Sequence, residues 1–311
     1  MAAALPQARD NSRDNTRGAL LMVGSMLAFA FEDLFPKRAA MALPPGQVVA
    51  MIGAAGALCF WAIAALKGQP ILHRDALSAP ALIRSLSEAG ATMLYITALA
   101  LIPLTTNAAL LQASPLAVTM GAALILKEPV GWRRWTAIAV GFAGVLVILR
   151  PGTEGFSAAG LLTVACVLVL VARDLATRVM PARIGTFQLT TWAYLALVPA
   201  GLILMQIAGD APRPIQPAHR LDLVGALFTG LVGYWAVTAA MRLGEVSVVA
   251  PFRYTRLVFA MLLAMAFLGE RPDAATLAGS AMIIGSGLYA FWREARRTRP
   301  RSALSMPPDP R

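Results

Sequence analysis

Seven ionisable residues interrupt the long apolar stretches of this 311-residue chain: Glu32, Asp33, Glu88, Arg173, Asp174, Arg253 and Arg256. A charge inside an apolar segment of membrane length is costly, so such residues usually pair with one another or line the route of a substrate or proton. We interpret all of them except Glu88 as gate or ion-pair residues, in which an acid pairs with a base when its side of the protein is closed. The alternative for Asp33 and Asp174 is solvation at helix ends, beside Lys37, Arg38 and Arg178.

Glu88 shares one helix face with Thr92 and Tyr95, because the three residues are spaced four and three apart. This face is polar within an apolar helix, so we expect it to point into the protein. Glu88 is then available to pair with Arg253 or Arg256, to meet a substrate amino group, or to carry a proton. A purely structural ion pair is the alternative.

Aromatic and small polar residues add to the candidate site. Aromatic side chains suit a flat or amphipathic substrate through stacking and hydrogen bonds, although helix packing is the alternative role for each of them. The candidate substrate-binding residues are Glu88, Thr92, Tyr95, Gln112, Ser114, Tyr234, Trp235 and Tyr254. Pro115 and Pro251 each free a backbone carbonyl one turn upstream, so we expect bent helices there, either as hinges or as static kinks. The glycine pairs 141/144, 230/233 and 285/287 are expected to permit close helix contact.

Motifs of enzymes and of cofactor sites are missing from the sequence. It contains no phosphate-binding G-x-x-x-x-G-K-[ST] loop, no H-E-x-x-H and no Cys/His cluster. Cys59 and Cys166 both lie within apolar stretches, which argues against a structural disulfide or a metal site. We therefore predict no catalytic residue, no metal and no cofactor.

The elements that must position these residues are membrane-spanning helices. Hydrophobic residues make up 58% of the chain, charged residues only 14%, and the mean hydropathy is +0.66. A bilayer-spanning helix needs about 20 apolar residues, and the stretches lack the alternation of barrel strands. We predict an all-α integral membrane protein with ten spans, near 18–40, 46–66, 79–100, 104–126, 131–149, 158–180, 185–207, 219–242, 245–268 and 274–293.

The positive charge is distributed unevenly along this topology. The net charge is +11, and most of the 27 Lys and Arg residues fall on the side that holds both chain ends. The positive-inside rule places that side, with the tails 1–17 and 294–311, in the cytoplasm. This accounts for the basic composition without a nucleic-acid partner.

The sequence also contains an internal duplication. Asp33-Leu34 and Lys37 recur 141 positions later as Asp174-Leu175 and Arg178. Glu128, followed by a proline, recurs 142 positions later as Glu270. Repeated spans are typical of secondary transporters, with the site at the interface of the halves. Since five spans per half is an odd number, we predict two inverted repeats, 18–150 and 151–293, related by an axis in the membrane plane.

Ten spans in two sets of five, very short loops and the Glu-Pro ending of the fourth and ninth spans resemble the drug/metabolite transporter superfamily, in particular its EamA-type members. The resemblance covers about residues 18–293, and its strongest parts are 115–128, Gly141-Phe-Ala-Gly144 and Phe267-Leu-Gly-Glu270. One departure is Leu257, which stands where the first repeat has Pro115.

The resemblance implies a ten-helix bundle around a central cavity and the movement of small organic metabolites. Our best prediction is an exporter of amino acids, aromatic ones included, that works by alternating access as a monomer in the cytoplasmic membrane. A metabolite uptake permease or a drug efflux protein is the alternative within transport. A membrane enzyme or scaffold without transport is the competing class, and the absent motifs argue against an enzyme.

Overall fold

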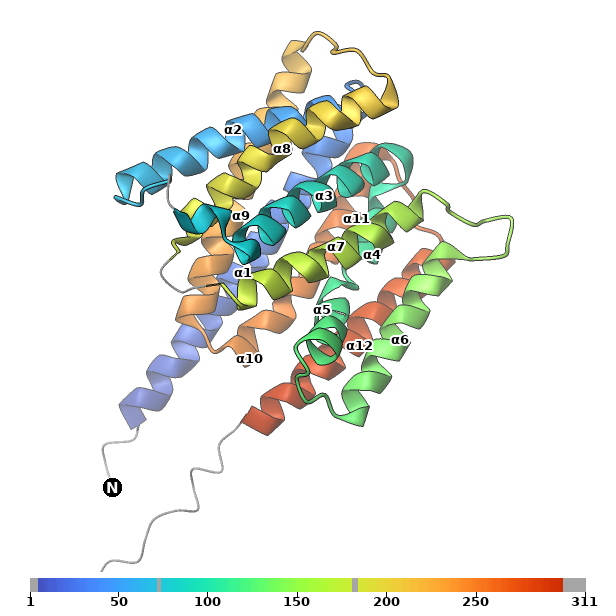
Figure 1. The fold of residues 1–311 in the computed structure, drawn as a ribbon. Helices are drawn as coiled ribbons and strands as arrows, with labels where there is room; N and C mark the ends of the chain where they lie inside the picture. The colour runs from blue at the N-terminus through green and yellow to red at the C-terminus, as the bar shows by residue number, and fades with distance from the viewer. Residues whose placement is uncertain (1–4, 72–73, 181–183, 299–311) are drawn as a thin grey trace, which may run out of the picture.

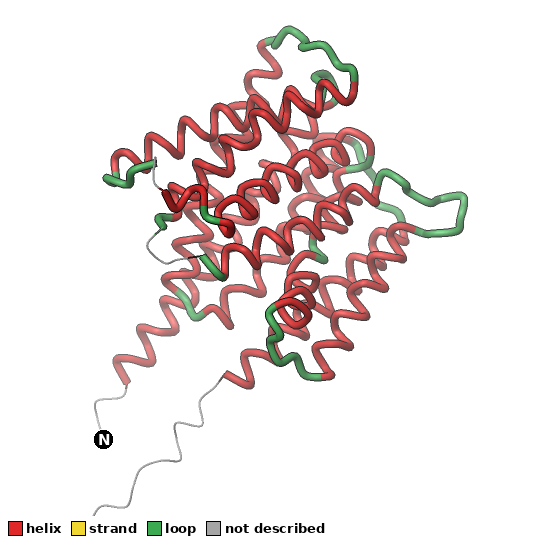
Figure 2. The backbone as a smooth tube through the Cα atoms, in the orientation of Figure 1, coloured by secondary structure: helices red, strands yellow, loops and turns green. Residues whose placement is uncertain are grey.

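The computed structural model describes residues 5–71, 74–180 and 184–298, and every regular element in these ranges is helical (Figures 1 and 2). The predicted tail from residue 299 onward lies outside them. The α-helices are α1 (Leu5–Ala40), α2 (Pro45–Leu66), α3 (Ala79–Leu101), α4 (Leu104–Leu111), α5 (Ser114–Ile125), α6 (Trp132–Leu149), α7 (Gly160–Arg178), α8 (Thr186–Ala208), α9 (Pro217–Leu243), α10 (Val246–Val249), α11 (Thr255–Leu268) and α12 (Ala274–Thr298). Two short 3₁₀ helices are η1 (Arg74–Leu77) and η2 (Ala250–Tyr254).

Within the described ranges, nine helical segments are long and apolar enough to cross a membrane. Helix α3 has the length, 23 residues, but is not one of the nine, because Arg84, Glu88 and two serines reduce its hydropathy. Length and composition therefore do not confirm the predicted count of ten. Helices α1 and α12 also extend into the predicted tails, since their polar ends continue the helices of the first and last spans.

The fourth and ninth predicted spans, 104–126 and 245–268, are not continuous helices, because each is broken into shorter helical segments. The first break separates α4 from α5 at residues 112–113, directly before Pro115. The second replaces one continuous helix by α10, η2 and α11, with Pro251 in η2. The helix is thus interrupted near both prolines, because proline cannot donate the backbone hydrogen bond that a continuous helix needs. A hinge at either position stays a prediction.

Helix packing reflects the duplication. By the sequence offsets, α1 corresponds to α7, α2 to α8, α3 to α9 and α6 to α12. Helix α1 packs along α9 and α3 packs along α7, while α2 pairs with α8 and α6 with α12. Exchanging each helix for its counterpart reproduces the same pairs, as expected for two halves related by a two-fold axis. Glycine permits the close contact in two of these pairs. A Cβ on Gly144 of α6 would lie 2.7 Å from the carbonyl oxygen of Gly279 in α12, and a Cβ on Gly46 of α2 would lie 2.5 Å from that of Gly201 in α8.

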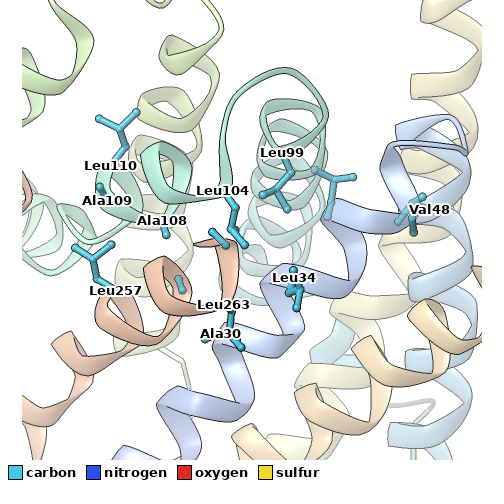
Figure 3. Close-up of a cluster of buried hydrophobic side chains, with 14 of the residues drawn as sticks. Ala30, Leu34, Val48, Leu99, Leu104, Ala108, Ala109, Leu110, Leu257 and Leu263 are labelled. Carbon is cyan, nitrogen blue, oxygen red and sulfur yellow. The ribbon is translucent and has the colours of Figure 1, made fainter. Parts of the chain in front are cut away.

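The two ends of the bundle are packed differently. Helix α1 begins and α12 ends at the same end, at the lower left of Figure 1, which we call the termini end. At the opposite or far end, one continuous apolar core joins both halves, and Figure 3 shows Leu34, Leu99, Leu104 and Leu263 meeting there. At the termini end the core is split: one cluster joins α5 to α7, and a separate one joins α1, α9 and α10. Among the described residues, the apolar core is therefore continuous at the far end and divided into two clusters at the termini end.

Candidate functional site

A bidentate ion pair links the first helix to the second half. Asp33 of α1 is only 2% exposed. The Arg256 guanidinium, at the start of α11, donates from Nε to Asp33 Oδ2 over 2.9 Å and from Nη2 to Oδ1 over 2.6 Å. The Tyr95 hydroxyl of α3 donates to the same Oδ1 over 2.7 Å. Fork-like pairing of this kind is strong and directional, so three helices are joined at one buried carboxylate.

A second ionic group lies on α3 and α7. Arg173 donates from Nε to Asp174 Oδ1 over 2.8 Å, and its Nη1 lies 3.3 Å from Glu88 Oε1. Of the alternatives considered for Glu88, pairing with Arg253 or Arg256 is not what this structure has, because α3 packs along α7 and brings Arg173 to Glu88 instead. Arg253 is exposed, yet it interacts electrostatically with Asp174 and Arg173.

Glu32 differs from the other acids of this region. Its neighbour Asp33 pairs with Arg256, whereas the Glu32 carboxylate has no hydrogen bond or ion pair among the described residues. It lies against the backbone of α9, where a Cβ on Gly230 would be 2.7 Å from Glu32 Oε1. Arg256, Asp33 and Glu88 are within its electrostatic range. Glu32 is thus a half-buried carboxylate with free acceptor oxygens in the middle of the bundle.

Aromatic rings from three helices lie next to one another, and one of them, Tyr194, is within electrostatic range of the Glu32 carboxylate. The Phe60 ring of α2 has its centroid 5.1 Å from that of Tyr194 in α8 and 6.0 Å from that of Tyr234 in α9. Tyr194 lies within electrostatic range of Glu32, Glu88 and Tyr234. Its ring rests on Gly56, where any side chain would collide with it. We call Glu32, Phe60, Tyr194 and Tyr234 the aromatic cluster.

The remaining predicted binding residues are placed differently. Trp235 follows Tyr234 on α9 but turns away from the bundle, with 66% of its surface exposed, since adjacent helical residues differ by about 100°. Tyr254 is 4% exposed, and its hydroxyl lies against Gly287 of α12 rather than in the aromatic cluster. Gln112 has a buried Nε2 without a partner in the described ranges. Thr92 and Ser114 are half-buried, and no contact of theirs joins them to the ionic groups.

Sequence reasoning missed two residues at the far end. The Glu270 carboxylate accepts hydrogen bonds from the amides of Leu104 and Thr105, at 2.7 and 2.9 Å. Lys37 donates to the carbonyls of Leu99 and Ile102 instead of solvating the end of α1. The signal for both was in the repeat, where a glutamate before proline and a basic residue after Asp-Leu each occur twice.

Comparisons with known proteins agree with this architecture. The model of the EamA-like transporter family matches residues 16–150 and again residues 158–292. A riboflavin transporter from Rhizobium johnstonii is 30% identical over 91% of this chain and 93% of that protein. A riboflavin transporter from Vibrio cholerae is 28% identical over 91% and 95%. The pseudopaline exporter CntI from Pseudomonas aeruginosa is 25% identical over 86% and 93%.

A solved crystal structure shares the fold with a TM-score of 0.63 and 20% identity, over 92% of this chain and 99% of that one. The family matches fall on the two halves whose helices exchange in the packing, and together they span most of the sequence. The chain is therefore a member of the EamA-like transporter family, a multi-pass membrane transporter.

Proposed function

We propose that the protein moves a flat, polar heteroaromatic metabolite of the riboflavin type across the cytoplasmic membrane by alternating access, with both termini in the cytoplasm. The observation that carries the proposal is the aromatic cluster. Tyr194, Tyr234 and Phe60 supply ring faces, and Glu32 supplies a carboxylate for the hydrogen-bond donors of a substrate ring. Two relatives named as riboflavin transporters support the same substrate class.

Charge pairing favours this class over the amino acids that the sequence alone suggested. A zwitterion needs free charges of both signs. The aromatic cluster offers the Glu32 carboxylate but contains no cation, and Arg173 and Arg256 nearby are already paired with Glu88, Asp174 and Asp33. A substrate without ionised groups needs only ring stacking and hydrogen bonds. Aromatic amino acids are therefore tested as competitors in the flux assay below. We also propose that the protein works as a monomer and without a metal or cofactor.

Flux into sealed proteoliposomes tests the proposal. Labelled riboflavin should enter saturably through the purified protein, and an excess of aromatic amino acids should leave its entry unchanged. Glu32→Gln should reduce the flux about tenfold or more, since a hydrogen bond to a charged group contributes about 1.5–3 kcal/mol. Glu154→Gln, on an exposed loop, is the matched control and should transport normally.

A pH gradient across the same vesicles separates facilitated diffusion from proton coupling. Saturable entry of an amino acid with no entry of riboflavin would refute the substrate class and restore the amino-acid prediction. Normal riboflavin entry through Glu32→Gln would remove Glu32 from the site.

A further inference from the structure

Two charged residues hold the corner where α3 turns into α4, at the far end. Lys37 Nζ donates to the carbonyls of Leu99 and Ile102, over 2.5 and 2.8 Å, where α3 ends. Glu270 binds the first amides of α4. The Lys37 ammonium thus lies at the C-terminus of α3 and the Glu270 carboxylate at the N-terminus of α4. Each charge is opposite in sign to the helix dipole at that end, so both contacts are favourable. We call Lys37 and Glu270 the far clamp; it ties α1 and α11 to this corner.

The second half contains a corner of the same shape, where α9 turns into α10. The Gly244 amide donates to the carbonyl four residues back over 3.1 Å, as Ile102 does over 2.9 Å in the first half. Gly244 has φ −105° and ψ 161°, close to φ −123° and ψ 160° at Ile102. At the repeat offset of 142, the carbonyls of Leu99 and Ile102 correspond to those of Met241 and Gly244. The amides of residues 104 and 105 correspond to those of residues 246 and 247.

The residues that correspond to the far clamp are Arg178 and Glu128, at the termini end. The two glutamates are presented by the same turn, because the Glu128 and Glu270 amides each donate to the carbonyl six residues back over 3.2 Å. Gly269, before Glu270, has φ 65°, and Lys127, before Glu128, has φ 55°. A left-handed lysine is unfavourable by about 1–2 kcal/mol, so the turn is maintained in the first half despite its cost.

Arg178 and Glu128 do not hold the second corner in this structure. Arg178 Nη1 donates to Glu128 Oε1 over 2.8 Å, and both side chains are about half exposed, at 47% and 48%. Helix packing at the two ends differs in the same way as the hydrogen bonds. At the far end α4 packs on α11, whereas among the described residues α5 has no comparable packing on α10 or η2. The clamp residues therefore bind their corner at the far end, where the apolar core is continuous, and do not bind it at the termini end, where the core is divided.

We propose that Arg178 and Glu128 form an alternate clamp that closes the termini end. In that state Arg178 bonds the α9 carbonyls of Met241 and Gly244, and Glu128 bonds the first amides of segment 246–268. Lys37 and Glu270 then release the far corner and pair with each other, as Arg178 and Glu128 do here. The proposal rests on the proposed transport function, for which it names the residues that hold each closed state.

Distances between spin labels test the proposal without any substrate. Full-length protein in which Cys59 and Cys166 are replaced is labelled at Pro103 and Phe267 for the far end. The pair related to it by the repeat, Glu245 and Ile125, reports on the termini end; all four positions are exposed. Double electron–electron resonance in lipid vesicles then gives the populations of the closed and open forms of each end.

Glu270→Gln should lengthen the 103–267 distance and shorten the 245–125 distance, with a change of about tenfold in the population ratio, because a charge-assisted clamp becomes a neutral one. Glu128→Gln should act in the opposite direction, and the double variant should return towards the unmodified ratio. Glu154→Gln is the control and should change neither distance.

Two results would overturn the clamp: unchanged distances in Glu270→Gln, or shifts of the same sign in Glu270→Gln and Glu128→Gln. The riboflavin flux of the same vesicles is an independent measurement. Distance shifts as expected without riboflavin flux would support the clamp and refute only the substrate. Normal flux with unchanged distances would support the proposed function and refute the clamp.

Discussion

Arg256→Met is expected to destabilise the folded protein by about 3–5 kcal/mol, because removal of one partner leaves a buried charge uncompensated. The Asp33 carboxylate is 2% exposed and receives two hydrogen bonds from Arg256. Among the described residues, the one remaining donor is the Tyr95 hydroxyl. Reversible unfolding in mild detergent micelles, followed by the loss of helical circular dichroism, measures the change in the free energy of unfolding.

A surface ion pair in the same protein is the matched comparison. Arg178 and Glu128 are both about half exposed, so Arg178→Met should cost less than about 1 kcal/mol. Adding Asp33→Asn to Arg256→Met should recover much of the lost stability, since the unpaired charge is then gone. Equal effects of Arg256→Met and Arg178→Met would show that burial of the Asp33 pair has no energetic consequence.

Gly279→Ala is expected to cost about 1–3 kcal/mol through overpacking between α6 and α12. A Cβ at this position would lie 2.5 Å from the carbonyl oxygen of Gly144 and 2.5 Å from Cγ1 of Ile148. The first of these is a backbone atom, which can move only if the two helices separate. The same unfolding measurement reports the effect, and size-exclusion chromatography shows whether the variant keeps the size of the unmodified protein.

Gly285→Ala on the same helix is the control for this prediction. A Cβ there meets no atom within 4 Å, so the only effect is the better helix propensity of alanine, a gain of up to about 1 kcal/mol. The two variants should therefore change stability in opposite directions. Destabilisation by both would mean that glycine at these positions serves the helix backbone and not the helix contact.

The glycine pairs also show how far pattern reasoning reached. Close contact was predicted for all three pairs, and it is present at Gly141, Gly144, Gly230, Gly233 and Gly287. It is absent at Gly285, which faces open space. Paired glycines predict that a helix has a face without side chains, against which another helix can pack closely. They do not predict at which glycine the neighbouring helix makes its contact.

The ionic groups show the same limit. The charges within apolar stretches were recognisable as paired or functional residues, and each of Asp33, Glu88, Arg173, Asp174 and Arg256 is indeed in an ion pair. The partner of Glu88 was not predictable, because it depends on α3 packing along α7. Of the proposed aromatic cluster, Phe60 was not predicted and Tyr194 was recognisable only as one of several aromatic residues in the spans, since an aromatic residue in a span has no local feature that separates the interior from the lipid face.

The sequence by itself determined the class of this protein: apolar segments of membrane length, repeated once, with matched acidic and basic residues at their ends. These properties follow from composition and spacing, which are local. Only the tertiary structure decided which charges meet, that Glu32 lacks a partner among the described residues, and which of two equivalent corners is clamped. Two repeats of similar sequence cannot reveal which corner is occupied, because that choice is made by helix packing between the halves.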